Sequence, residues 1–170
     1  LLGELFDFPK DVYAVGRLDK DSEGLLLLTN DKALNHKLLD PSYGHERTYW
    51  VQVERQIDDE AIERLSNGVE FRTNKKTYFS KPAKVRKLNE SEISLPERVP
   101  APRIKHGSSW VEIKLTEGKN RQVRKMTAAV GFPTLRLVRV AIEKVLLEGM
   151  QVGDVVEFEE KRLYKLLFDL

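Results

Sequence analysis

A charged, glycine-bounded turn followed at once by an unbroken apolar run is the feature that most constrains how this chain can fold. The turn spans residues 16–24 and carries Asp19, and the apolar run Leu25–Leu28 follows it. Asn30 and Asp31 end the run with turn-forming residues, so the pattern predicts a buried strand over Leu25–Thr29. The Asp19 carboxylate would then lie at the mouth of the fold, although an aspartate beside a turn is most often only a turn-forming group.

Length and composition set the class of protein. The 170 residues are 41% hydrophobic and 33% charged, which is typical of a globular chain of one ordinary domain or two small interlocked lobes. We expect a single domain over residues 1–170. Because the chain begins with Leu1, both a complete and an N-terminally shortened domain stay open.

Several classes of function are disfavoured by what the sequence contains. There is no cysteine, and the three histidines (His36, His45 and His106) lack the spacing of metal ligands. We therefore expect no metal and no cofactor. The longest apolar run is four residues, far below the length of a membrane span, and the sequence predicts a cytoplasmic protein without a membrane partner.

Basic residues are concentrated in one part of the chain. Residues 103–139 hold nine lysines and arginines against two glutamates, so the rest of the chain is net acidic. Such a basic stripe suits a polyanion. From charge alone, a solvated charged surface is the more common explanation.

The remaining pattern predicts strands joined by short connections, with helices between them. Strands are expected at 47–54, 81–88, 109–116, 134–142 and 154–159, and helices at 32–39, 59–66, 121–130 and 161–170. Asp58-Asp59 and Asn120 are the expected caps of the second and third helices. Residues 90–108 hold three prolines and predict a surface loop. The fold class is therefore α+β, mainly antiparallel sheet flanked by helices.

Four separated motifs resemble one known family. They read GRLDKDSEGLLLLTND from 16, RTYWVQV from 47, EGKNRQVRKM from 117 and GFPTLRLVR from 131. In this order they resemble the bacterial pseudouridine synthases that act on ribosomal RNA, a family with a member for the small ribosomal subunit and members B, E and F for the large one. The second and fourth motifs are most similar to the synthase E subgroup. The resemblance implies a catalytic fold with a cleft between two lobes.

The same resemblance assigns roles to individual residues. It implies that Asp19 is the catalytic carboxylate, that Tyr49 stacks on the target base, and that Leu137 lines the base pocket. It also implies that Arg124 pairs with Asp19. Arg121, three residues earlier in the expected helix, would share a face with Arg124.

Arg17 directly precedes Leu18 and Asp19 in the first motif. It is placed to enter the stack that a flipped base leaves, or to hold the displaced strand. A surface phosphate contact or an ion pair is an equally good explanation of this residue.

The implied reaction converts a uridine to pseudouridine in ribosomal RNA, with 23S RNA favoured. The uridine would be flipped out of the RNA, and Asp19 would either attack C1′ or remove the C2′ proton. We expect a monomer that needs no protein partner. Two alternatives stay open: a non-catalytic RNA-binding module, which leaves the first two motifs unexplained, and a glycoside hydrolase, which needs a second carboxylate aimed at the same bond.

Overall fold

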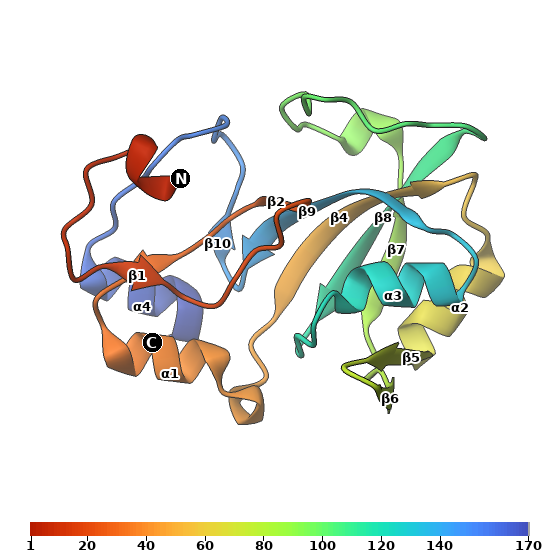
Figure 1. Ribbon diagram of the computed structural model, residues 1–170. Helices are drawn as coiled ribbons and strands as arrows, with labels where there is room; N and C mark the ends of the chain where they lie inside the picture. Colours follow the sequence, from red (N-terminus) through yellow and green to blue (C-terminus); the bar gives the residue numbers. More distant parts are fainter. Residues whose placement is uncertain (170) are drawn as a thin grey trace.

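An antiparallel sheet forms the centre of the protein. The computed structural model describes residues 1–169, and Figure 1 shows the sheet between helices that lie towards its two ends. The strands run in the order β10-β9-β4-β8-β7, and a short strand, β2, pairs with β9 in parallel. Their bounds are β2 (Glu23–Gly24), β4 (Arg47–Glu54), β7 (Lys84–Leu88), β8 (Ser108–Leu115), β9 (Thr134–Ile142) and β10 (Val145–Leu146). The predicted α+β class is confirmed.

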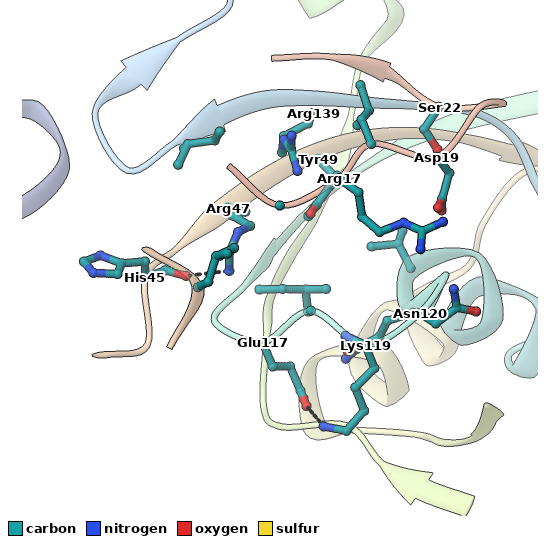
Figure 2. A pocket seen from close by; sticks show the side chains of 18 of the residues that line it. Arg17, Asp19, Ser22, His45, Arg47, Tyr49, Glu117, Lys119, Asn120 and Arg139 are labelled. Atoms are coloured by element: carbon teal, nitrogen blue, oxygen red, sulfur yellow. Dashed lines mark hydrogen bonds and ion pairs between the residues drawn. The ribbon is translucent and has the colours of Figure 1, made fainter. Parts of the chain in front are cut away.

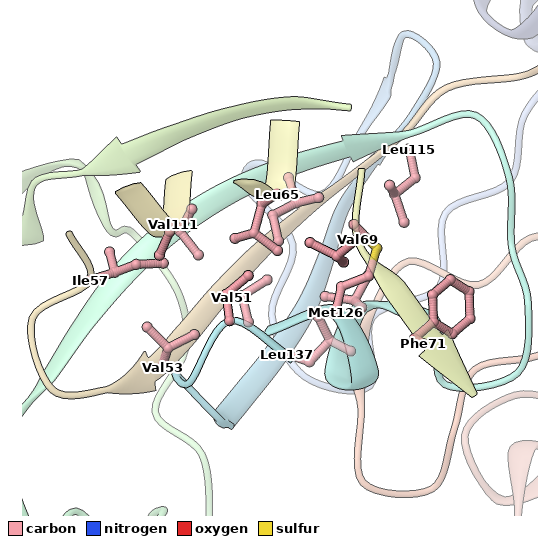
Figure 3. Close-up of a cluster of buried hydrophobic side chains, with 14 residues drawn as sticks. Val51, Val53, Ile57, Leu65, Val69, Phe71, Val111, Leu115, Met126 and Leu137 are labelled. Atoms are coloured by element: carbon pink, nitrogen blue, oxygen red, sulfur yellow. The ribbon is translucent and has the colours of Figure 1, made fainter. Parts of the chain in front are cut away.

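Two helices cover one face of this sheet and close the larger core. They are α2 (Asp59–Asn67) and α3 (Gln122–Ala129), and α2 begins where the predicted cap Asp58 accepts a hydrogen bond from the backbone N–H of Ala61. Leu65 from α2 and Met126 from α3 are fully buried against Val51 of β4. Figure 3 shows these side chains meeting over the sheet. We call residues 47–141 the sheet lobe.

The two ends of the chain pack together into a second core. It involves β1 (Tyr13–Ala14), β3 (Leu28–Thr29), α1 (Lys32–Leu39), β10 and α4 (Glu160–Phe168). Leu34, Leu38 and Leu167 are buried there. We call residues 1–46 and 142–169 the end lobe, which Figure 1 shows to the left of the sheet. Every helix within residues 1–169 is too short or too polar to span a bilayer.

Some expected elements differ from those observed. Of the predicted strand at 25–29, only Leu28–Thr29 forms a strand (β3), because the backbone leaves β9 after Leu25 and turns to pair Leu28 with Ala14. No strand forms at 154–159, a segment that is almost wholly exposed. The predicted strand at 81–88 begins only at Lys84.

A hairpin also went unpredicted. It joins β5 (Glu70–Thr73) to β6 (Lys76–Phe79) through Asn74 and Lys75, which both have positive φ. This is the backbone of a two-residue hairpin turn. An asparagine between two short alternating runs was the signal for it.

Candidate active site

A cavity of about 580 Å³ lies where the two lobes meet. Of the residues predicted to form the site, the cavity is lined by Arg17, Asp19, Tyr49, Arg121 and Leu137. Arg124, by contrast, is not among the lining residues. Figure 2 shows Asp19 and Ser22 on one side of this cavity, and His45 and Arg47 on the other.

The turn that carries Asp19 is fixed to the sheet by β2. Glu23 pairs with Val138, and Gly24 pairs with Arg139. Gly24 has a φ of +109°, and a Cβ atom at this position would lie 2.2 Å from the Arg139 carbonyl oxygen. Only glycine allows so close an approach, so Gly24 sets how near the Asp19 turn comes to β9. Within the turn, the N–H of Ser22 donates to the Asp19 carbonyl (2.9 Å).

Two arginines at the start of α3 hold the same turn from the other side. Arg121 donates two hydrogen bonds to the Asp21 carboxylate (2.9 and 2.7 Å), and one of its nitrogens lies 3.7 Å from an Asp19 oxygen. Arg124 donates to the Asp21 carbonyl (2.7 Å) and to the Ser22 hydroxyl (3.1 Å). The hydrogen bond from Arg121 is the main reason that the pKa of Asp21 falls to about 2.

The predicted pair of Arg124 with Asp19 is therefore corrected. Arg121, rather than Arg124, is the arginine within ion-pair distance of Asp19, while Arg124 forms its ion pair with Asp21. The helix begins one residue later than expected, and Arg121 is its N-cap in a left-handed conformation (φ +53°). The two arginines thus do not share a helical face, but both reach Asp21. The cap predicted at Asn120 is also wrong.

The basic stripe is not one exposed surface. Arg136 and Arg139 are more than nine-tenths buried. Arg136 forms a bidentate pair with Glu23 (both 2.8 Å), and Lys119 pairs with Glu117 at 3.3 Å. Much of the charge that suggested a polyanion site therefore serves internal contacts. The solvated-surface explanation is also wrong for these residues.

A third wall of the cavity comes from the central strands. Tyr49 of β4 lies directly opposite Arg139 of β9, so their side chains are neighbours on one face of the sheet. Arg47, two residues before Tyr49, points to the same face. Sequence reasoning missed both Arg47 and Arg139. Arg47 lies two residues before Tyr49, and Arg139 lies two residues after Leu137. This spacing was the available signal.

These groups suit chemistry at a carboxylate. Asp19 has a side chain that is 20% exposed, and it lines the same cavity as an aromatic ring and an apolar leucine. Within residues 1–169, no three histidine, aspartate or glutamate side chains gather as a metal site would need. The arrangement can hold a planar ring near one acid, with cations on both sides.

The chain matches a family model described as RNA pseudouridylate synthase over residues 4–129. It is 49% identical over 150 residues to ribosomal large subunit pseudouridine synthase E of Xanthomonas campestris pv. campestris, covering 87% of this chain and 78% of that protein. The Vibrio parahaemolyticus protein of the same name is 45% identical, over 88% of this chain and 61% of that protein. Ribosomal large subunit pseudouridine synthase B of Bacillus subtilis is 33% identical, over 94% and 60%.

Solved structures show the same fold. A crystal structure of a pseudouridylate synthase superposes with a TM-score of 0.79 at 27% identity, covering 97% of this chain and 64% of that one. A chain in the crystal structure of a Cbf5-Nop10-Gar1 complex has a TM-score of 0.59 at 13% identity, a likeness of fold alone. The chain therefore spans about two thirds of several proteins that it matches.

Proposed function

Because the chain belongs to the RNA pseudouridylate synthase family, whose members are isomerases, we propose that it converts a specific uridine of ribosomal RNA to pseudouridine. The printed names of its large-subunit relatives favour 23S RNA. The observation that carries this proposal is the position of Asp19 in the cavity between the lobes, beside Tyr49 and Leu137.

Asp19 is the proposed catalytic carboxylate. The C1′–N1 bond breaks and its electron pair stays on the uracil. The sugar is stabilised either by an Asp19 ester at C1′ or by transfer of the C2′ proton to Asp19, which gives a glycal. After the ring rotates, C5 bonds to C1′ while the Asp19 ester breaks or, from the glycal, while Asp19 returns its proton to C2′. The C5 proton then leaves, and N1 takes up a proton. A carboxylate suits both routes because cleavage builds positive charge on the sugar.

The target base reaches the cavity by flipping out of the RNA, at a cost of a few kcal/mol. Tyr49 stacks on the flipped base, and Leu137 forms the apolar wall beside it. Arg17 is exposed where the cavity opens, and there it fills the vacated stack or contacts the RNA backbone.

Arg121 and Arg124 complete the proposed substrate site. Arg121 orients the Asp19 carboxylate from 3.7 Å and meets the RNA at the rim, where its side chain is 39% exposed. Arg124 supports the turn from beneath through Asp21 and Ser22. We further propose that residues 1–170 hold one catalytic domain of two interlocked lobes, which acts as a cytoplasmic monomer without metal, cofactor or protein partner.

Replacing Asp19 tests the proposal. We expect Asp19→Asn to abolish pseudouridine formation and to keep RNA affinity within a few-fold, because phosphate contacts supply most of the affinity. Single-turnover assays on ribosomal RNA measure the first, and filter binding measures the second. Asp58→Asn is the matched control, because asparagine also caps helices well and Asp58 lies outside the cavity lining.

Full turnover by Asp19→Asn would overturn the mechanism. Carbodiimide mapping of pseudouridine in ribosomal RNA from cells with and without the protein separates the alternatives. A non-catalytic RNA-binding module would leave the map unchanged, and a glycoside hydrolase would leave an abasic site in place of pseudouridine. Activity that survives dialysis against a chelator, once Mg²⁺ has been restored to fold the RNA, supports the absence of a catalytic metal other than Mg²⁺.

A further inference from the structure

Two guanidinium groups line the cavity on the wall away from Asp19. They belong to Arg47 and Arg139, and the Tyr49 side chain lies beside both of them. Figure 2 shows Arg139 and Tyr49 near the middle of the cavity and Arg47 beyond them. The resemblance to the family assigned no role to either arginine.

Neither arginine has a carboxylate partner within 4.0 Å among residues 1–169. Arg139 is 7% exposed, and its Nε and Nη2 both donate to the Leu25 carbonyl (2.9 and 2.6 Å). Arg47 donates to the Leu38 carbonyl (2.8 Å). In contrast, Arg136 on the other face of β9 has Glu23 as a full ionic partner.

The acid whose charge acts on Arg47 is Glu143, and it is already engaged. Glu143 accepts a hydrogen bond from the N–H of Glu46 (2.6 Å) and lies 3.3 Å from Nδ1 of His45. Burial lowers the pKa of Arg47, and the neighbouring charge of Arg139 lowers it further. Because two sheltered cations without an anion are costly, the cavity wall is suited to a negative charge that arrives with the ligand.

We propose that Arg47 and Arg139 stabilise the uracil anion that forms when the C1′–N1 bond breaks. The inference rests on the proposed function and deepens it. When the electron pair of that bond moves onto N1, resonance spreads the charge over N1, O2 and O4. Guanidinium donors beside the ring meet this charge as it develops, and fixed donors of this kind act mainly on the transition state.

The position of Tyr49 favours the base over a phosphate as the anion. The register of β4 and β9 places the Tyr49 ring directly beside Arg139, so a ring stacked on Tyr49 has its edge near the guanidinium groups. Leu137, two residues before Arg139 on the same face, adds an apolar contact. A phosphate would meet the same cations but would gain nothing from the aromatic and aliphatic neighbours.

A better leaving group separates the two explanations. Fluorine at C5 withdraws electrons and stabilises the uracil anion without the enzyme. Single-turnover rates at saturating enzyme are compared for RNA with uridine or 5-fluorouridine at the target. Fluorine takes the place of the C5 proton, so the final loss of that proton cannot occur with 5-fluorouridine. Cleavage of the C1′–N1 bond is therefore measured in both RNAs as the loss of intact nucleoside after nuclease digestion. For Arg47→Gln we expect a fall of roughly 100-fold with uridine and less than about 10-fold with 5-fluorouridine.

Charge-preserving and remote variants keep the test interpretable. Arg47→Lys should recover most of the rate with uridine, since it restores a cation. Arg86→Gln is the control, because Arg86 lies outside the cavity lining and has Glu92 and Glu112 as partners; it should keep the normal rate on both RNAs. Arg139→Gln repeats the comparison at the buried position, with Arg139→Lys as its charge-preserving partner and thermal unfolding to confirm the fold.

Two outcomes would overturn the inference. An equal fall on both RNAs shows that Arg47 does not act on the leaving group, and a normal rate at saturation shows that it only clamps phosphate. Failure of the proposed function is a separate result, because the unchanged protein would then form no pseudouridine from uridine.

Discussion

The sheet lobe and the end lobe differ in the length of their strands and in the size of their cores. The sheet lobe has strands of eight and nine residues, and its core joins both central strands to α2 and α3. The end lobe is held by strands of two residues and by a smaller set of buried side chains. It also leaves large apolar residues in solvent, among them Leu1, Phe6 and Val152.

The difference explains how the cavity is divided. Tyr49, Leu137 and Arg139 come from long strands in the sheet lobe, where extended pairing fixes their positions. Asp19 comes from an end-lobe turn that is attached to β9 by a short stretch, the paired residues Glu23 and Gly24 and then Leu25. We therefore expect most of the stability to come from the sheet lobe. The position of Asp19 depends instead on the contact of its turn with β9, which we call the joint between the lobes.

The largest effect should come from shortening a buried side chain in the sheet-lobe core. Leu65 is fully buried in α2, and Leu34 is 2% exposed in α1. We expect Leu65→Ala to lower the free energy of unfolding by about 4 kcal/mol and Leu34→Ala by about 2 kcal/mol, because the smaller end-lobe core relaxes more easily. Urea unfolding measures both. Equal losses would contradict the contrast between the lobes.

The joint itself is tested by Gly24→Ala. The side chain would force apart β2 and β9, and we expect a loss of about 3 kcal/mol from the positive φ and the clash, together with loss of pseudouridine formation. Gly3→Ala is the control, since no atom lies within 4 Å of its Cβ position. Normal activity in Gly24→Ala would show that the Asp19 turn does not need this contact.

The smallest effect concerns pH and the ion pairs at the joint. The pKa of Asp21 is about 2 in the folded protein against an ordinary 3.8, so its contribution is complete above about pH 4 and is lost as the pH falls towards 2. Asp21 is 44% exposed, which limits the contribution to about 1 kcal/mol. Asp21→Asn should therefore flatten the fall in stability between pH 5 and 2.5, as measured by urea unfolding at each pH. An unchanged profile would mean that Asp21 contributes nothing to the joint.

The long elements were predictable because local signals and packing agree in them. The alternation over 47–54 and the Asp58 cap gave β4 and the start of α2 almost to the residue. The apolar run at Leu25 failed as a strand because its partners lie in two places: β9 takes Leu25, and β1 takes Leu28. Local pattern does not reveal such a division.

The site followed a similar rule. Asp19, Tyr49 and Leu137 come from three separate motifs and line one cavity, as the resemblance implied. Pairing between charges was less predictable, because a one-residue shift in the start of α3 gave Arg121 the position near Asp19. The spacing of Arg47 and Arg139 was visible in the sequence, but that both arginines lie beside Tyr49 followed only from the pairing of β4 with β9, which are far apart in the chain.

The parallel contact of β2 with β9 also determines how late in synthesis the Asp19 turn can be attached to the sheet. Gly24 meets Arg139 only after about 115 further residues have been added, which takes on the order of ten seconds at ordinary rates of synthesis. Until then a nascent chain carries Asp19 on an unattached turn, with neither Leu137 nor Arg139 made. The two lobes can therefore complete the walls of the cavity only late in synthesis, after β9 has been made.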